Sequence, residues 1–418
     1  MSIFILFIYI VSVFVAIRTN TDIFSPAKYY LLNFLVFYSG AWFEDQEIAL
    51  WGCILLVLLI GSITVALESG IRPFPRRMAF NKESLISESL TWWLWLLSLP
   101  GILSQLYIVT WVGGIEDYIN ILHYRVEAFS GLGWVRILTQ TLSVINLVYF
   151  SLGLMGGRPL YWWSGFTIHL LLTASIGILS GSRSGLLNIF VSMLFCFHYL
   201  RFRIPAIYIL MFAFTLVLTA GIMGALREQV KVSEGEFYTS SENEGLTIKT
   251  NIFFNGVEPL EILIKSELED LAWGSTFLTA FTHLIPRVVW PGKPDSGGVF
   301  FTKIYTGDAW QGRSNLAPTF LGELVINFDW AAGIFMFIIL YCLIMVAIVK
   351  LYNSFLKSMA IKSGKDLVLS VVWYNSILFA GVALMTGEFT NTLHIFFLTK
   401  AIPLILLRRI FRLAIKFK

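Results

Sequence analysis

The chain has 418 residues, of which 57% are hydrophobic and 13% are charged, and its mean hydropathy is +0.76. A soluble globular domain carries about 25% charged residues, and a disordered chain requires low hydrophobicity. Both classes are therefore excluded, and an integral membrane protein is predicted. Cys53, Cys196 and Cys342 each lie in an apolar run without metal-ligand spacing, which predicts small buried side chains and neither a disulfide nor a zinc site.

Long apolar windows predict an all-α polytopic membrane protein with eleven transmembrane helices. Their expected limits are 2–17, 29–43, 49–67, 89–110, 137–156, 160–180, 186–200, 204–223, 331–349, 366–386 and 392–407. The first run has no basic residue before it and no small-residue cleavage site after it, so we interpret it as a span and not as a signal peptide. We expect three parts: eight spans in 1–223, a large extracytoplasmic loop in 224–330, and three spans with a basic tail in 331–418.

The basic residues fix the expected orientation. One set of alternating connections, which includes the C-terminal tail, carries 18 Lys and Arg, whereas the short connections of the other set carry three. Because cytoplasmic loops hold an excess of basic residues, we expect the C-terminus in the cytoplasm. With an odd number of spans, the N-terminus and the loop at 224–330 then lie outside.

Arg183 stands out in the turn Gly181-Ser-Arg-Ser-Gly185 between two apolar helices on the expected outer face. An ionisable residue among apolar helices is costly and is by default a functional hypothesis. The two glycines allow close approach of a ligand, and the N-terminus of the next helix favours an anion. The alternative is that Arg183 only reaches a lipid phosphate.

The large outer loop divides into an acidic and a basic half. Residues 228–270 contain ten carboxylates against three lysines, and 287–313 contain four bases against two aspartates. Leucines and isoleucine at 260, 263, 264, 268 and 271 predict an amphipathic helix, which we expect to pack on the outer ends of the spans.

A proline-rich segment follows in the basic half of the loop. Three prolines in 284–295 restrict the backbone around Arg287 and Lys293. Cations held in this way suit an anionic ligand, and the alternative is a proline-rich turn with solvated charges. His283 lies four residues before Arg287 and is an acid/base candidate. Glu388, in a later outer turn, is either catalytic or solvated, and we favour the solvated side chain. We expect His169 and His394 to be internally hydrogen-bonded.

The order of three motifs resembles the Wzy-type O-antigen and oligosaccharide repeat-unit polymerases. These are the Gly-Ser-Arg-Ser-Gly turn, the segment Ile285-Pro-Arg-Val-Val-Trp-Pro-Gly-Lys-Pro294, and the segment Asn315-Leu-Ala-Pro-Thr-Phe-Leu-Gly-Glu-Leu-Val-Ile-Asn-Phe328 leading into a span. The resemblance covers 175–345 by motif and the whole chain by topology. It implies a lipid-donor, GT-C-like glycosyltransferase of the bacterial inner membrane with its active site on the periplasmic face.

The resemblance also implies the reaction and the residues that carry it. A glycan linked to undecaprenyl pyrophosphate is transferred to the non-reducing end of a second lipid-linked repeat unit, without a metal, cofactor or nucleotide sugar, and a chain-length regulator protein is a possible partner. Outer arginines hold the pyrophosphate, which maps by motif onto Arg183 and Arg287. Arg227 and Arg313 are assigned because they flank the loop, and Lys293 because it belongs to the rigid segment.

Glycosyl transfer also requires a base for the acceptor hydroxyl. Glu323 is the first candidate because its apolar surroundings favour a raised pKa, and His283 and Glu258 follow. In the competing interpretation, Glu323 is buried and pairs with Arg183 or Arg313. The related O-antigen ligases carry a histidine before the re-entering helix, where this chain has Leu316-Ala-Pro-Thr319, which favours a polymerase. A ligase-like transferase and a flippase or other transporter remain the alternatives.

Overall fold

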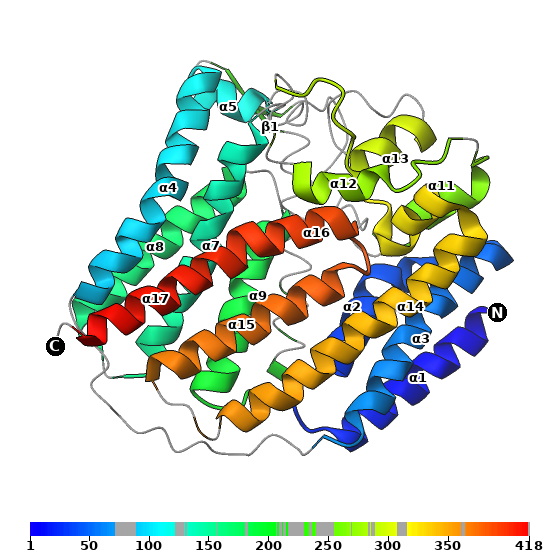
Figure 1. Ribbon diagram of the computed structural model, residues 1–418, viewed down its shortest axis with the longest axis horizontal. Helices are drawn as coiled ribbons and strands as arrows, with labels where there is room; N and C mark the ends of the chain where they lie inside the picture. The colour runs from blue at the N-terminus through cyan, green and yellow to red at the C-terminus, as the bar shows by residue number, and fades with distance from the viewer. Residues whose placement is uncertain are drawn as a thin grey trace. The chain divides into compact units, whose positions relative to one another are not determined.

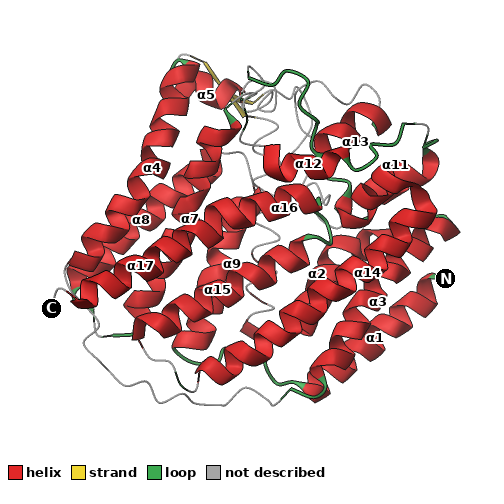
Figure 2. Ribbon diagram, viewed as in Figure 1, coloured by secondary structure: helices red, strands yellow, loops and turns green. Residues whose placement is uncertain are grey.

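A computed structural model of the chain describes residues 1–71, 89–121, 129, 132–156, 158–179, 183–205, 207–208, 211, 215, 230–233, 236–239, 255–268, 270–282, 285, 289–306, 316–359, 361 and 364–416. These residues are predominantly helical, with one antiparallel pair of short strands, β1 (Val230–Ser233) and β2 (Glu236–Thr239), in which Val230 pairs with Thr239 (Figures 1 and 2). The chain forms two compact units. Unit 1 comprises 1–75, 250–356 and 377–394, and unit 2 comprises 76–249, 357–376 and 395–418.

Unit 1 is built on long apolar helices. They are α1 (Ser2–Thr19), α2 (Pro26–Tyr38) with the 3-10 turn η1 (Ser39–Phe43), α3 (Ile48–Glu68) and most of α14 (Thr319–Met359). The phenol of Tyr30 on α2 joins three of them, because it donates to the carbonyl of Val57 on α3 at 2.7 Å and its ring lies 5.9 Å from that of Tyr341 on α14. On α1, Ile3 is 82% exposed. Apolar side chains left outside the packed core in this way suit contact with lipid.

Helix α14 is sharply bent at Asp329, whose φ of 69° and ψ of 169° are non-helical. The bend folds the first part of the helix back, so that a Cβ at Gly333 would meet the backbone nitrogen of Val325 at 2.8 Å. Only glycine tolerates this approach. The long apolar stretch therefore begins after Asp329, close to the predicted start of a span at 331, and the preceding ten residues form a separate buried helix.

Four shorter helices of unit 1 belong to the predicted loop or adjoin it. They are α11 (Glu258–Lys265), α12 (Ser275–Thr282), α13 (Gly297–Tyr305) and α16 (Phe389–Ile395) (Figure 1). The predicted amphipathic helix is confirmed over its first two turns, because α11 buries Leu260 and Leu263 and packs on α3. Its predicted continuation to residue 271 is wrong, because the backbone becomes extended at Ser266.

Unit 2 centres on α7 (Gly133–Leu154), which packs against α4 (Ser89–Val112), α8 (Leu160–Leu179) and α9 (Arg183–Leu200). The unit also contains α5 (Ile115–Ile121), the first part of α15 (Gly364–Ala383), the π-helix η5 (Phe396–Ala401) and α17 (Ile402–Lys416). His169 of α8 is buried, and its ring nitrogens bond Ser98 of α4 at 2.8 Å and Asn146 of α7 at 3.1 Å. This confirms the prediction of an internally hydrogen-bonded histidine.

Seven helices among the described residues are long and apolar enough to cross a membrane, which is consistent with a polytopic membrane protein. They are α1, α3, α4, α7, α8, α14 and α15. Most of the predicted span at 204–223 lies outside the described residues. The predicted span at 29–43 corresponds to α2 and η1, and the one at 392–407 is divided among α16, η5 and α17. Within 187–200, α9 contributes a shorter apolar helix.

Candidate functional site

The side chain of Glu323 lies among the short helices of unit 1. It projects from the short helical part of α14 before the bend at Asp329 and is 0% exposed. Its Oε1 accepts hydrogen bonds from the hydroxyls of Thr390 at 2.9 Å and Thr276 at 3.2 Å, and its Oε2 accepts one from the backbone N–H of Phe389. One carboxyl group therefore joins α12, α14 and α16, which are far apart in the sequence.

A second buried carboxyl group, that of Glu388, faces Glu323. Glu388 precedes α16, is 3% exposed, and accepts a hydrogen bond from the backbone N–H of Gly298 at the start of α13. A Cβ built on Gly297 would lie 2.9 Å from Oε2 of Glu388 and 3.0 Å from Oε1 of Glu323. The two carboxyl groups thus converge on the first residues of α13, and glycine at 297 leaves room for both.

Burial and the neighbouring charge of Glu323 raise the pKa of Glu388 to about 8. Desolvation disfavours the charged form of a carboxyl group, and a second negative charge disfavours it further. Burial raises the pKa of Glu323 as well, so the pair as a whole favours keeping a proton. Such a pair can hold and exchange a proton, which is a property that catalytic carboxyl pairs share.

A network of hydrogen bonds fixes the position of Glu323. The side-chain amide of Asn327, one turn further along α14, donates to Thr276 Oγ1 at 2.8 Å and to the carbonyl of Glu323 at 2.6 Å. Its side-chain oxygen accepts from the N–H of Gly274 at 2.8 Å. Buried polar networks whose groups are satisfied rigidify their surroundings. The carboxyl pair consequently sits on a rigid support on the α12 and α14 side.

Among the predicted cations, Lys293 is the nearest in sequence to the start of α13, which contacts the carboxyl pair. It lies in the proline-rich segment four residues before Gly297, is partly buried, and donates from Nζ to the carbonyl of Ile285 at 2.9 Å. The following turn is fixed by an ion pair of 2.8 Å between Lys303 and Asp295. The proline-rich segment thus leads into the start of α13, which lies against Glu323.

The remaining predicted residues lie elsewhere or outside the described residues. Arg183 is the first residue of α9 in unit 2, so the predicted helix start at this turn is confirmed. The structure does not describe the side chain of Arg183. His283, Arg287, Arg227 and Arg313 also lie outside the described residues. Their assignments stay predictions.

Glu388 corrects one expectation. The sequence favours a solvated Glu388, but the side chain is buried and the start of α13 covers it. A signal was present in the sequence: Gly297 and Gly298 follow a proline-rich segment, and paired glycines permit close backbone approach. The glycines could not, however, have identified which carboxyl group approaches them.

Comparison of the chain with protein-family models, with curated proteins and with solved structures finds no match.

Proposed function

We propose that the protein is a polysaccharide polymerase of the Wzy type, which transfers an undecaprenyl pyrophosphate-linked glycan to the non-reducing end of a lipid-linked repeat unit. One observation supports it most: the helix that follows the proline-rich segment begins against Glu323 in unit 1. The segment that ends with Lys293 and Pro294 leads into α13, and Gly297 at the start of α13 contacts Glu323 of the segment 315–328. The start of α13 thus lies four residues after the cation Lys293 and against the carboxyl group of Glu323.

In this proposal the chain spans the inner membrane eleven times, with the C-terminus in the cytoplasm and the site on the periplasmic face. The arginines Arg183 and Arg287, with Arg227, Arg313 and Lys293, hold the donor's pyrophosphate. Its negative charge grows as the glycosidic bond to the lipid breaks, and guanidinium groups stabilise it through bidentate hydrogen bonds. Arginine thus supplies the charge stabilisation that a metal supplies in other transferases.

The acceptor hydroxyl must lose its proton as it attacks the anomeric carbon. Glu323 is the proposed base, with His283 as the next candidate. Because the Glu323 carboxyl is closed off from solvent, this role requires that the start of α13 move aside when the acceptor enters. The Glu323–Glu388 pair then takes the proton, while the departing lipid pyrophosphate leaves on the side of the arginines.

A transporter for a lipid-linked oligosaccharide is the second candidate, and the same carboxyl pair favours it. A buried pair that holds one proton near neutral pH suits proton-coupled transport, in which acidic residues form proton relays. The candidates differ in the species that accumulates when the protein is removed. A polymerase leaves single repeat units on the lipid outside, whereas a transporter leaves them inside.

The decisive experiment compares lipid-linked glycans in cells that lack the protein and in cells that carry variants. We expect Arg183→Ala and Arg287→Ala to abolish chain extension at normal protein levels, and Arg183→Lys to fail as well, because a lysine cannot form bidentate contacts. Arg201→Ala is the matched control for Arg183, since Arg201 is exposed and lies at the other end of α9. Long polymer in the Arg183→Ala cells would refute the pyrophosphate assignment.

A further inference from the structure

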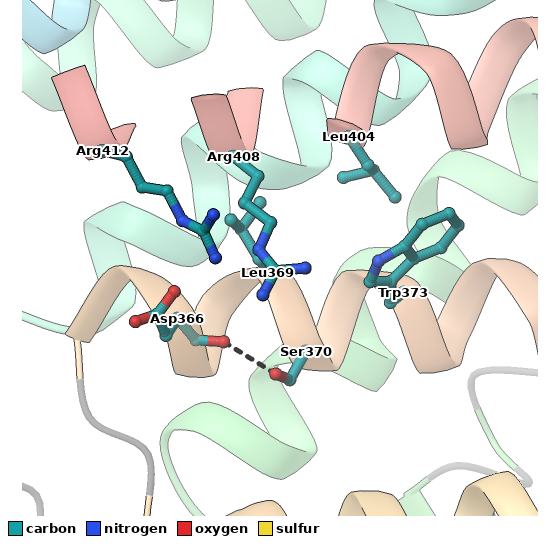
Figure 3. Close-up of a pocket in the computed structure, with 7 residues that line it drawn as sticks. All are labelled: Asp366, Leu369, Ser370, Trp373, Leu404, Arg408 and Arg412. Atoms are coloured by element: carbon teal, nitrogen blue, oxygen red, sulfur yellow. Dashed lines mark hydrogen bonds between the residues drawn. The ribbon is translucent and has the colours of Figure 1, made fainter. Parts of the chain in front are cut away.

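A cavity of about 170 Å³ lies between α15 and α17 in unit 2 (Figure 3). One water occupies about 30 Å³ in the liquid, so the cavity can hold several waters or one phosphate-sized group. The proposed reaction does not involve it. Seven residues line it: Asp366, Leu369, Ser370, Trp373, Leu404, Arg408 and Arg412.

The lining changes from polar to apolar along the two helices. The helices run in opposite directions, because Nζ of Lys365 lies 5.6 Å above the ring of Phe411 and the ring of Trp373 lies 6.1 Å from that of Phe396. The start of α15 therefore lies beside the end of α17. Asp366 and Arg412 line the cavity at this end. Leu404 and Trp373 line it about two turns further along the helices, as Figure 3 shows.

The charged side chains that line the cavity have a net charge of +1. Two arginines, Arg408 and Arg412, one turn apart on α17, face one aspartate, Asp366, in the first turn of α15. In Figure 3 the guanidinium of Arg412 points toward the Asp366 carboxylate, and that of Arg408 extends into the cavity beside Leu369. A guanidinium recognises phosphate oxygens by parallel hydrogen bonds. A group with one negative charge would balance the remaining charge of the cavity.

We propose that this cavity binds a phosphate-containing group with a net charge of −1, and that Arg408 is its main ligand. The headgroup of an anionic phospholipid is such a group. Helix α15 (Gly364–Ala383) is long and apolar enough to cross a membrane, so the cavity lies at the start of a span, where the phosphates of the lipid headgroups stand. The apolar end of the cavity, at Trp373 and Leu404, suits the beginning of an acyl chain, because tryptophan is enriched at membrane interfaces. This proposal does not depend on the polymerase function.

The test uses the full chain, purified in a neutral detergent and stripped of lipid. Binding of phosphatidylglycerol, phosphatidylcholine and inorganic phosphate is measured by native mass spectrometry and by the shift of the thermal midpoint. We expect phosphatidylglycerol to bind and phosphatidylcholine, which is zwitterionic, to bind at least tenfold more weakly. Loss of one charge-assisted hydrogen bond weakens binding by about tenfold or more, so Arg408→Ala should raise the dissociation constant of phosphatidylglycerol by that factor.

Arg409→Ala is the matched control, because Arg409 carries the same charge and is exposed like Arg408, but does not line the cavity. We expect it to change the constant by less than twofold. Equal weakening by Arg408→Ala and Arg409→Ala, or equally tight binding of the two lipids, would overturn the proposal. If inorganic phosphate binds with the same dependence on Arg408 and phosphatidylglycerol does not, the phosphate site is confirmed with free phosphate as its ligand. The thermal midpoints without lipid show whether each variant is folded.

Discussion

The change Glu388→Gln separates the charge of the buried carboxyl pair from its shape. A glutamine side chain has nearly the same size as glutamate, and its oxygen can still accept the hydrogen bond from Gly298 N–H. Its amide group can donate to the hydroxyl of Ser296, which bonds the glutamate in the native protein. The substitution therefore keeps the contacts of α13 with the turn before α16, but the side chain no longer ionises.

The sign of the effect follows from the pKa of Glu388, which burial and the charge of Glu323 raise from 4.5 to about 8. Below pH 4.5 the group is protonated in both the folded and the unfolded chain. Between pH 4.5 and about 8 the unfolded chain loses the proton while the folded chain keeps it, so the free energy of unfolding falls as the pH rises. Each unit by which the pKa in the folded chain exceeds that in the unfolded chain adds up to about 1.4 kcal/mol to this loss. Glutamine does not ionise, so the variant escapes this loss.

Thermal midpoints of the native chain and of Glu388→Gln, measured in detergent at pH 5, 6.5 and 8, check this reasoning. Unit 1 has roughly 200 residues, and for a unit of that size 1 kcal/mol shifts the midpoint by about 2–4 °C. We expect the variant to gain several degrees over the native chain between pH 5 and pH 8. Glu267→Gln is the control, because Glu267 is exposed, and its difference should not change with pH. A pH-independent difference for Glu388→Gln would mean that the carboxyl group is not protonated in the folded protein.

Three further substitutions test the site and the fold. Glu323→Gln should fold like the native chain, because its amide oxygen can accept from Phe389 N–H and its NH₂ can donate to the threonine hydroxyls. If Glu323 is the base, this variant loses polymerisation at normal thermal stability; full polymer would shift the role to His283. Gly297→Ala should lower the free energy of unfolding by about 1–3 kcal/mol, as overpacking does, because its Cβ would meet both carboxyl groups. Gly292→Ala should not, because a Cβ there would make only an ordinary contact, 4.0 Å from Trp290 Nε1. Asp329 has a φ of 69° and a ψ of 169°, a region of the backbone map that mainly glycine adopts. Asp329→Gly should therefore keep or raise the free energy of unfolding, whereas Asp329→Val should lower it by about 1–3 kcal/mol in chemical unfolding. Equal midpoints for the two variants would exclude backbone strain at this residue.

The sequence predicts those features of the fold that depend on runs of apolar residues. A window of about 20 apolar residues must be a helix in lipid, whatever its partners are, and α1, α3, α4, α7, α8 and α15 follow their predicted limits closely. The bend in α14 was not predictable in this way. Asp329 and Gly333 are ordinary residues in the sequence, and the fold-back appears only when the buried helix before the bend packs on α11 and α13 through Leu263, Phe301 and Ile326.

The site shows why a residue's chemistry is easier to predict than its partners. The sequence points to Glu323 as a candidate base because it is an acidic residue in an apolar run, and its burial agrees with that local pattern. The neighbours of Glu388 gave no such pattern, because its burial depends on Gly297 and Gly298, ninety residues earlier in the chain. A carboxyl group can be buried only if hydrogen bonds replace water, and here the donors are backbone N–H groups, which every residue has. A partner that contributes only its backbone leaves little trace in the sequence except a requirement for small residues, so paired glycines after a rigid segment are the feature that points to such a contact.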